Sequence, residues 1–138
     1  MPKVNQLTVP VENRPGTLAH VCRTLGSAKV NILGFLLTTS GSKSLVKLIV
    51  DDVEKAKQAL YEAGLPYFEQ AVLRARIANV PGALGRFAEK LAAKNINILS
   101  GYQTIEKDSK KASVVLEVSH LDKALRVGAP TASDSLYE

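Results

Sequence analysis

The chain has 138 residues, of which 46% are hydrophobic and 22% charged, and its formal net charge is +5. This composition is that of a soluble globular protein, and no apolar run approaches the roughly 18 residues needed to span a bilayer. The single cysteine excludes an internal disulfide framework, and the N-terminus lacks the apolar core of a signal peptide. We therefore expect a cytoplasmic protein without a membrane partner. The mild positive charge is explained by a solvated surface as well as by an anionic partner.

The first half of the chain predicts strand, helix, strand, strand, helix and strand, in that order. Alternating apolar and polar residues predict a strand at 6–12, and three further strands are predicted at 31–39, 44–50 and 67–70. One apolar stripe at helical spacing predicts a helix over 17–28, formed by Leu18, Val21, Cys22 and Leu25. Asp52 is a suitable N-cap for a second helix, which ends at Gly64.

The second half repeats the first at a shift of 66 positions. Eight of the 23 positions in 11–33 are identical in 77–99: Asn13/Asn79, Pro15/Pro81, Gly16/Gly82, Leu18/Leu84, Leu25/Leu91, Asn31/Asn97, Ile32/Ile98 and Leu33/Leu99. A repeat of this length predicts two copies of one small domain, at residues 1–70 and 71–138. Units of about 65 residues are marginal alone, so the halves should share an interface or dimerise.

The second copy predicts a strand at 72–78 and a helix with the same apolar stripe, which includes Phe87 and Leu91. The hairpin loop at 107–111 is longer than its counterpart, so that the shift becomes 68 beyond it. The segment Gly128-Ala129-Pro130 occurs where the second helix of the first copy still continues, so this helix should be shorter by at least one turn. Residues 131–137 are open to three interpretations: a weak last strand, a cover or a frayed tail.

This order of elements predicts an α+β protein built from two ferredoxin-like βαββαβ units. In each unit two helices should cover one face of a four-stranded antiparallel sheet, with the second strand at an edge. In the first copy that edge is apolar, through Ile32, Leu33, Phe35, Leu36 and Leu37. Because an apolar edge is normally paired or covered, we expect the two second strands to pair into one eight-stranded sheet. The bare sheet face or the helices could then support a homodimer.

The turn between the first strand and the first helix is the candidate ligand site in each copy. Gly16 and Gly82 permit positive φ and close backbone approach, at helix N-termini that favour an anion such as a carboxylate. The side chains of Asn13 and Asn79 can accept a hydrogen bond from an ammonium group. Each residue type is common in turns without function, but recurrence of the whole pattern favours binding. The candidate ligand-binding residues are Asn13, Arg14, Pro15, Gly16, Thr17, Leu18, Asn31 and Ile32, with Asn79, Val80, Pro81, Gly82, Ala83, Leu84, Asn97 and Ile98.

The pattern Asn-X-Pro-Gly-X-Leu, followed by Asn-Ile-Leu, occurs at 13–18 with 31–33 and again at 79–84 with 97–99. It resembles the signature of ACT domains, small regulatory modules that bind amino acids in metabolic enzymes and also occur as free-standing tandem proteins. The resemblance covers residues 6–127 and implies the βαββαβ fold, dimeric sheet pairing and effector sites at the interface. The matching positions are Asn13, Gly16, Asn79 and Gly82. The shortened second helix departs from the family pattern, so one of the two sites could be empty or degenerate.

An enzyme would need a placed base, nucleophile or metal. His20 and His120 lie outside any metal-ligand spacing, and Cys22 falls on the buried stripe of a helix. The sequence has no P-loop, no dinucleotide fingerprint and no Cys-x-x-Cys pair. We therefore expect no catalytic residue, no metal and no cofactor.

An RNA-binding module can share this order of strands and helices. Such a module stacks bases on aromatic residues of its central strands. The central strands here carry aliphatic residues instead, and the whole chain has three Phe, four Tyr and no Trp. We therefore do not expect a nucleic-acid partner.

These observations predict a non-enzymatic regulatory module. It should bind a small free amino acid at the interface between two ACT-like units and alter its self-association or a metabolic partner. The alternative is a structural interaction domain whose ligand sites are vestigial. A thermal-shift screen of the twenty amino acids separates the two functions, because only the first is stabilised by a ligand.

Overall fold

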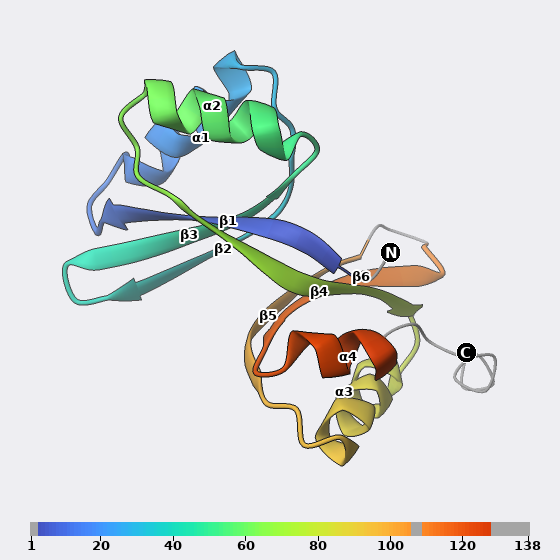
Figure 1. Ribbon diagram of the computed structural model, residues 1–138. Coiled ribbons are helices and arrows are strands. Elements are labelled where there is room, and N and C mark those ends of the chain that lie inside the picture. Colours follow the sequence, from blue (N-terminus) through green and yellow to red (C-terminus); the bar gives the residue numbers. More distant parts are fainter. Residues whose placement is uncertain (1–2, 106–108, 128–138) are drawn as a thin grey trace. The chain divides into compact units, whose positions relative to one another are not determined.

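The computed structural model describes residues 3–105 and 109–127. The chain divides into two compact units, Asn5–Gln70 and Ala71–Glu138 with Met1–Val4, here called the N-terminal and C-terminal units. In the N-terminal unit the elements follow the predicted order, and the C-terminal unit repeats that order as far as it is described (Figure 1). The structure thereby confirms the predicted tandem of ferredoxin-like α+β units.

In the N-terminal unit the strands β2, β3 and β1 lie side by side in that order in the antiparallel sheet, with two helices on one face (Figure 1). Its elements are β1 (Lys3–Glu12), α1 (Thr17–Ser27), β2 (Ile32–Ser40), β3 (Lys43–Val50), α2 (Val53–Glu62) and the beginning of β4 (Phe68–Ala78). The register aligns Leu48 of β3 with Leu7 of β1 and with Phe35 of β2. The central strand β3 therefore fixes the positions of both neighbours.

A core of aliphatic side chains joins the helices of the N-terminal unit to its sheet. Its fully buried members from the strands and helices include Leu7, Val9, Val21, Leu25, Val46, Leu48 and Leu60. Burying a side chain of this size stabilises the fold by about 1.5–3 kcal/mol before the entropy cost is counted. Because Val21 and Leu25 lie on α1, this core holds α1 and the turn that precedes it.

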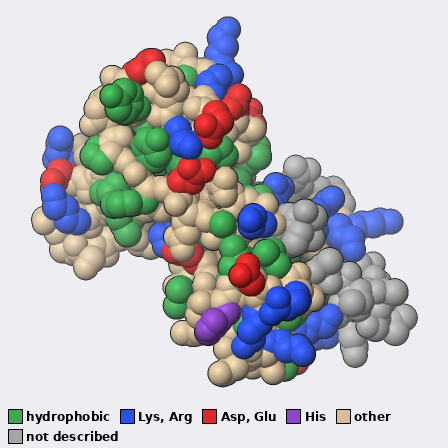
Figure 2. Space-filling model, viewed as in Figure 1, with side chains coloured by type: hydrophobic (Ala, Val, Ile, Leu, Met, Phe, Trp, Pro, Cys, Tyr) green, Lys and Arg blue, Asp and Glu red, His purple; other side chains and the backbone are tan. Residues whose placement is uncertain are grey.

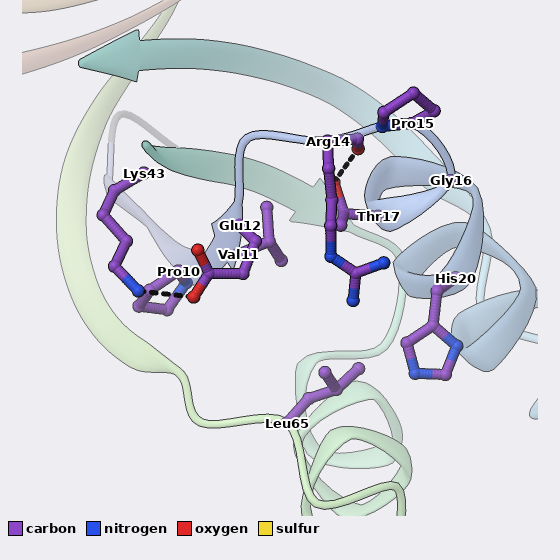
Figure 3. A pocket seen from close by; sticks show the side chains of 10 residues that line it. All are labelled: Pro10, Val11, Glu12, Arg14, Pro15, Gly16, Thr17, His20, Lys43 and Leu65. Carbon is purple, nitrogen blue, oxygen red and sulfur yellow. Dashed lines mark hydrogen bonds and ion pairs between the residues drawn. The ribbon is translucent and has the colours of Figure 1, made fainter. Parts of the chain in front are cut away.

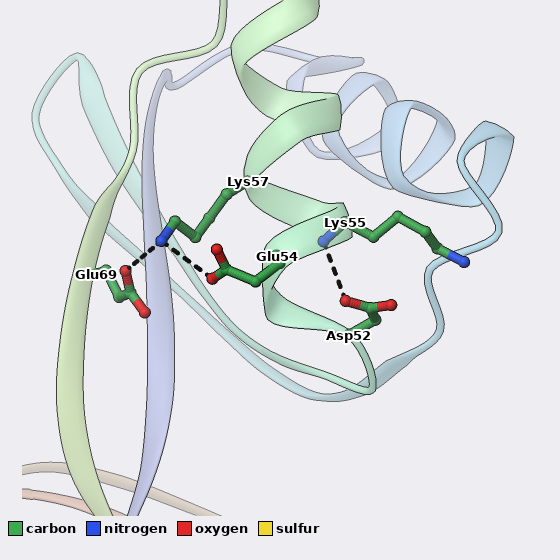
Figure 4. Close-up of polar contacts among 5 residues, drawn as sticks. All are labelled: Asp52, Glu54, Lys55, Lys57 and Glu69. Carbon is green, nitrogen blue, oxygen red and sulfur yellow. Dashed lines mark hydrogen bonds and ion pairs between the residues drawn. The ribbon is translucent and has the colours of Figure 1, made fainter.

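Polar contacts fix α2 and the start of β4 (Figure 4). Asp52 Oδ1 accepts a hydrogen bond of 3.1 Å from the backbone N–H of Lys55, which confirms the predicted N-cap. The Lys57 ammonium lies 2.9 Å from Glu69 of β4 and 3.2 Å from Glu54. Hydrogen bonds to Glu69 and then to Glu54 raise the pKa of Lys57 to about 12. Lys57 thus connects α2 to the first residues of β4.

The C-terminal unit has the strand order β4-β6-β5 and its own apolar core. Its further elements are α3 (Ala83–Ala93), β5 (Ile98–Ile105), β6 (Lys111–Val118) and α4 (Leu121–Val127). Phe87 and Leu91 of α3 are buried against Leu73 and Leu116 of the sheet. Helix α4 is described over Leu121–Val127, and its predicted early end at Gly128-Ala129-Pro130 lies outside the described residues.

The described residues form six strands where eight were predicted. The strands expected at 67–70 and 72–78 are one continuous strand, β4, because no glycine or proline interrupts the chain between them. The strand expected at 131–137 lies outside the described residues. Within the described part of the chain, β2 pairs only with β3 and β5 only with β6, so the predicted pairing of β2 with β5 is not observed.

Candidate functional site

The turn between β1 and α1, residues 13–17, is here called the first corner. Its Gly16 is the N-cap of α1 and has a left-handed conformation, with φ of 92°. Among the described residues, no side chain caps this helix end, and a Cβ placed on Gly16 would meet no atom within 4 Å. The Thr17 N–H donates to the Arg14 carbonyl (3.4 Å), and no side chain of the described residues caps the other N–H groups of the first turn of α1.

Asn13 ties the first corner to the tip of the β2–β3 hairpin. Its backbone N–H donates to the Ser42 carbonyl (2.9 Å) and its side-chain Nδ2 donates to the Gly41 carbonyl (3.0 Å). Asn79 makes the same two bonds, each 2.9 Å long, to the carbonyls of residues 109 and 110. The recurrence of asparagine at these positions thus has a structural reason. An amide that donates through Nδ2 still has Oδ1 as an acceptor for a ligand.

Asn31 and Asn97 lie at the start of the edge strands, where both are exposed. The Asn31 N–H donates to Asp51 Oδ1 (3.0 Å), and the Asp51 N–H donates back to the Asn31 carbonyl (3.1 Å). Asn97 makes the same pair of bonds with Ser119, through the hydroxyl and the backbone, at 2.9 Å each. In both units these bonds hold the start of the second strand to the end of the third.

A pocket of about 550 Å³ opens at the first corner, entirely within the N-terminal unit (Figure 3). Sites for small molecules commonly measure about 300–1,000 Å³. The lining comes from β1, the first corner, α1, β3 and the connection from α2 to β4: Pro10, Val11, Glu12, Arg14, Pro15, Gly16, Thr17, His20, Lys43 and Leu65. The Thr17 hydroxyl donates to the Arg14 carbonyl (3.1 Å), and this hydrogen bond stabilises the turn.

The pocket brings together only some of the residues predicted for this unit. Four of them line it: Arg14, Pro15, Gly16 and Thr17. Four others are not among its lining residues: Asn13, Leu18, Asn31 and Ile32. Sequence reasoning missed Glu12 and His20, although Glu12 adjoins the motif and His20 follows Gly16 by one helical turn. Lys43 and Leu65 carry no such signal, because only the fold brings them to the corner.

Opposite charges meet at the rim of the pocket. The Lys43 ammonium lies 2.5 Å from Glu12 Oε1 (Figure 3). The hydrogen bond from Lys43, and then the charge of the same ammonium, hold the pKa of Glu12 below its usual value, and the charge of Arg14 adds to this. Glu12 is therefore a carboxylate at neutral pH. With Lys43 and Arg14 it gives the pocket groups that can pair with either end of a zwitterion.

The Glu12–Lys43 pair predicts a pH dependence of stability. A carboxyl group whose pKa is lowered by folding stabilises the protein above its unfolded pKa, and this contribution is lost as the pH falls through the folded value. We expect Lys43→Met to lower the free energy of unfolding slightly at pH 7, and we expect this effect to shrink as the pH falls through the folded pKa of Glu12 and its carboxylate is protonated. Urea unfolding of both proteins from pH 7 to pH 3 measures this difference. Lys55→Met, which changes an exposed residue of α2, is the control. A Lys43→Met effect that stays constant down to pH 3 would contradict a stabilising Glu12–Lys43 pair.

The equivalent turn of the C-terminal unit, residues 79–83, is here called the second corner. Gly82 has φ of 87° and caps α3, as Gly16 caps α1. The residues around Gly82 differ in exposure. Ala83 is buried, Val80 packs against the core, and Pro81 and Leu84 are exposed. The space over Gly82 is occupied, since a Cβ built there would lie 2.6 Å from Nη1 of Arg86. The two corners thus share their backbone conformation, and they differ in that a side chain lies over the Cβ position of Gly82 but not over that of Gly16.

Basic side chains gather on the C-terminal unit (Figure 2). A pocket of about 610 Å³ on α3 and α4 is lined by Lys90, Ala93, Lys94, Lys123, Arg126 and Val127. Lys90 and Arg126 lie in the last turns of their helices, where a positive charge is stabilised by the helix dipole. The dipoles of the two helices therefore explain these two positive charges without a bound ligand.

Over 3–105 and 109–127, no helix is long and apolar enough to cross a membrane. Within the same ranges, no three His, Cys, Asp or Glu residues are grouped so that they could hold a metal ion.

Residues 6–62 match the family model of the ACT domain. This match lies within the N-terminal unit and covers the first copy of the motif, in agreement with the resemblance seen in the sequence. No curated protein sequence matches the chain.

Among solved structures, protein BT0572 from Bacteroides thetaiotaomicron is 27% identical, with a TM-score of 0.85 over 91% of this chain and 85% of that one. The ligand-free regulatory subunit of aspartate kinase from Thermus thermophilus is 18% identical, with a TM-score of 0.65 over 91% and 89%. The corresponding subunit from Thermus flavus is 16% identical, with a TM-score of 0.58 over 92% and 94%. The two kinase subunits share the fold of this chain.

Proposed function

We propose that the pocket at the first corner binds a free amino acid and that the chain is a regulatory module without catalytic activity. ACT domains are, as a family, small regulatory modules that bind amino acids, and residues 6–62 of the N-terminal unit match the model of that family. One observation carries the proposal: a single pocket joins the open helix N-terminus at Gly16 to a carboxylate, Glu12, and a guanidinium, Arg14. A zwitterionic ligand requires this combination of groups.

The charges of the pocket indicate how an amino acid would be oriented. Its carboxylate is assigned to the N-terminus of α1, where N–H groups and the helix dipole favour an anion, with Arg14 as a second donor. Its ammonium group is assigned to Glu12, which remains charged through its pairing with Lys43. Apolar lining residues offer a surface to the ligand's side chain: Pro10, Val11 and Leu65.

Regulation requires that the ligand bind two states of the protein with different affinity. We propose that these states differ in association, either of the chain with itself as a homodimer or with a metabolic enzyme in the cytoplasm. Self-association is supported by β2, whose Leu33, Phe35 and Leu37 are 44%, 53% and 37% exposed. Exposed apolar residues along an edge strand are normally paired or covered. An enzyme partner is supported by the fold that this chain shares with regulatory subunits of aspartate kinase.

A structural interaction domain is the second candidate, favoured by the same exposed residues of β2. In that case the pocket would be a vestige, and association would not depend on an amino acid.

A thermal-shift screen tests the proposed function. We expect at least one of the twenty amino acids, at millimolar concentration, to raise the melting temperature by about 4–8 °C for each kcal/mol of binding free energy gained. Arg14→Gln should lower the affinity for that ligand at least tenfold in calorimetric titration, since a hydrogen bond to a charged group contributes about 1.5–3 kcal/mol. Arg23→Gln, an exposed residue of α1 outside the pocket lining, should bind as the wild type does.

Size-exclusion chromatography with light scattering, with and without the ligand, then measures self-association. A screen in which no amino acid raises the melting temperature would instead support the interaction domain. Equal affinities of Arg14→Gln and the wild type would contradict the assigned pocket.

A further inference from the structure

His20 and Arg86 occupy the same position in the two copies of the repeat. Each follows its corner glycine by four residues, and each donates its backbone N–H to that glycine's carbonyl over 3.0 Å. Both side chains therefore start from the first turn of a helix whose N-cap has φ near 90°, at Gly16 and at Gly82. The backbones are equivalent, and only the side chains differ.

The two side chains leave different amounts of space over the glycine. In the first corner, no described atom lies within 4 Å of a Cβ placed on Gly16, and His20 lies at the pocket wall (Figure 3). In the second corner, the guanidinium of Arg86 lies across Gly82, with Nη1, Cζ and Nη2 at 2.6, 3.6 and 3.9 Å from the corresponding Cβ position. The group that covers Gly82 is thus a cation belonging to the chain itself.

We propose that Arg86 closes the second corner, so that the chain binds one amino acid, in its N-terminal unit. This proposal rests on the proposed function. The side chains at positions 20 and 86 then determine which of the two corners is open to a ligand. The guanidinium fills the space over the Cβ position of Gly82, beside the N-terminus of α3, whereas the same space is open in the first corner. Arg86 is half-buried and its side chain interacts with the surrounding protein, so a ligand would have to disturb these surroundings to displace it.

Exchanging the two residues tests this proposal by titration calorimetry with the amino acid found in the screen. The wild type should bind one ligand per chain, Arg86→His should bind two, and His20→Arg should bind at least tenfold more weakly in the first corner. Amide NMR spectra of each variant establish that both units remain folded. A wild-type stoichiometry of two, or an Arg86→His stoichiometry of one, would overturn the proposal.

A second measurement needs no ligand, so that it separates this inference from the proposed function. A neutral gadolinium chelate broadens the signals of solvent-exposed protons according to their accessibility. The α-protons of Gly16 should broaden at least threefold more than those of Gly82 in the wild type, and Arg86→His should remove the difference. Equal broadening in the wild type would show an open second corner and reject the inference. If the wild type binds no amino acid but this difference is present, the proposed function fails while the closure by Arg86 stands.

Discussion

Gly16→Val is expected to abolish the rise in melting temperature that an amino acid causes in the wild type. Gly16 has φ of 92°, which L-residues rarely adopt, so the substitution should cost about 1–2 kcal/mol of stability. Its two methyl groups would also occupy the open space over the first corner, where we place the ligand's carboxylate. The loss of binding should therefore exceed what the loss of stability explains.

Gly64→Val is the matched control for backbone strain. Gly64 has φ of 71°, and no described atom lies within 4 Å of its Cβ position, so the conformational cost should be similar. Gly64 does not line the pocket, and this variant should keep the ligand response. Calorimetric titration of both variants, with urea unfolding to measure stability, compares the two effects. Wild-type affinity in Gly16→Val would place the ligand elsewhere.

Leu25→Ala is expected to destabilise the N-terminal unit by about 2–5 kcal/mol, the usual cost of a cavity in a well-packed core. Leu25 is fully buried at the end of α1, where it holds that helix on the sheet. A unit of about 65 residues has little stability in reserve, so this loss should unfold much of it. Since α1 carries the first corner, amino-acid binding should be lost as well.

Leu91→Ala makes the same change at the repeat-related position of the C-terminal unit, which is also fully buried. It should destabilise that unit by a similar amount and leave the ligand's affinity for the first corner unchanged. Residue-resolved NMR during urea unfolding assigns each loss of stability to a unit, and calorimetric titration measures binding. If Leu91→Ala abolished binding while Leu25→Ala did not, the first corner would not be the site.

The fold was largely predictable because it depends on local patterns that occur twice. The apolar stripes of 17–28 and 84–91 predicted helices that the structure contains, and Asp52 was predicted to cap α2. The number of strands was not predictable from the repeat. Placing the boundary between the copies at 70/71 predicted separate strands at 67–70 and 72–78, whereas the structure has one continuous strand there, β4. A repeat marks equivalent residues but not where hydrogen bonding stops.

The sequence alone determined that two equivalent glycine corners exist, since glycine tolerates positive φ and the motif places it before a helix in both copies. The tertiary structure decided which atoms surround each corner. It brings Lys43 and Leu65 to the first corner from distant segments, because strand pairing and helix packing set their positions. It also lays Arg86 over Gly82 while leaving Gly16 open, a difference that depends on side-chain direction, which no sequence pattern specifies.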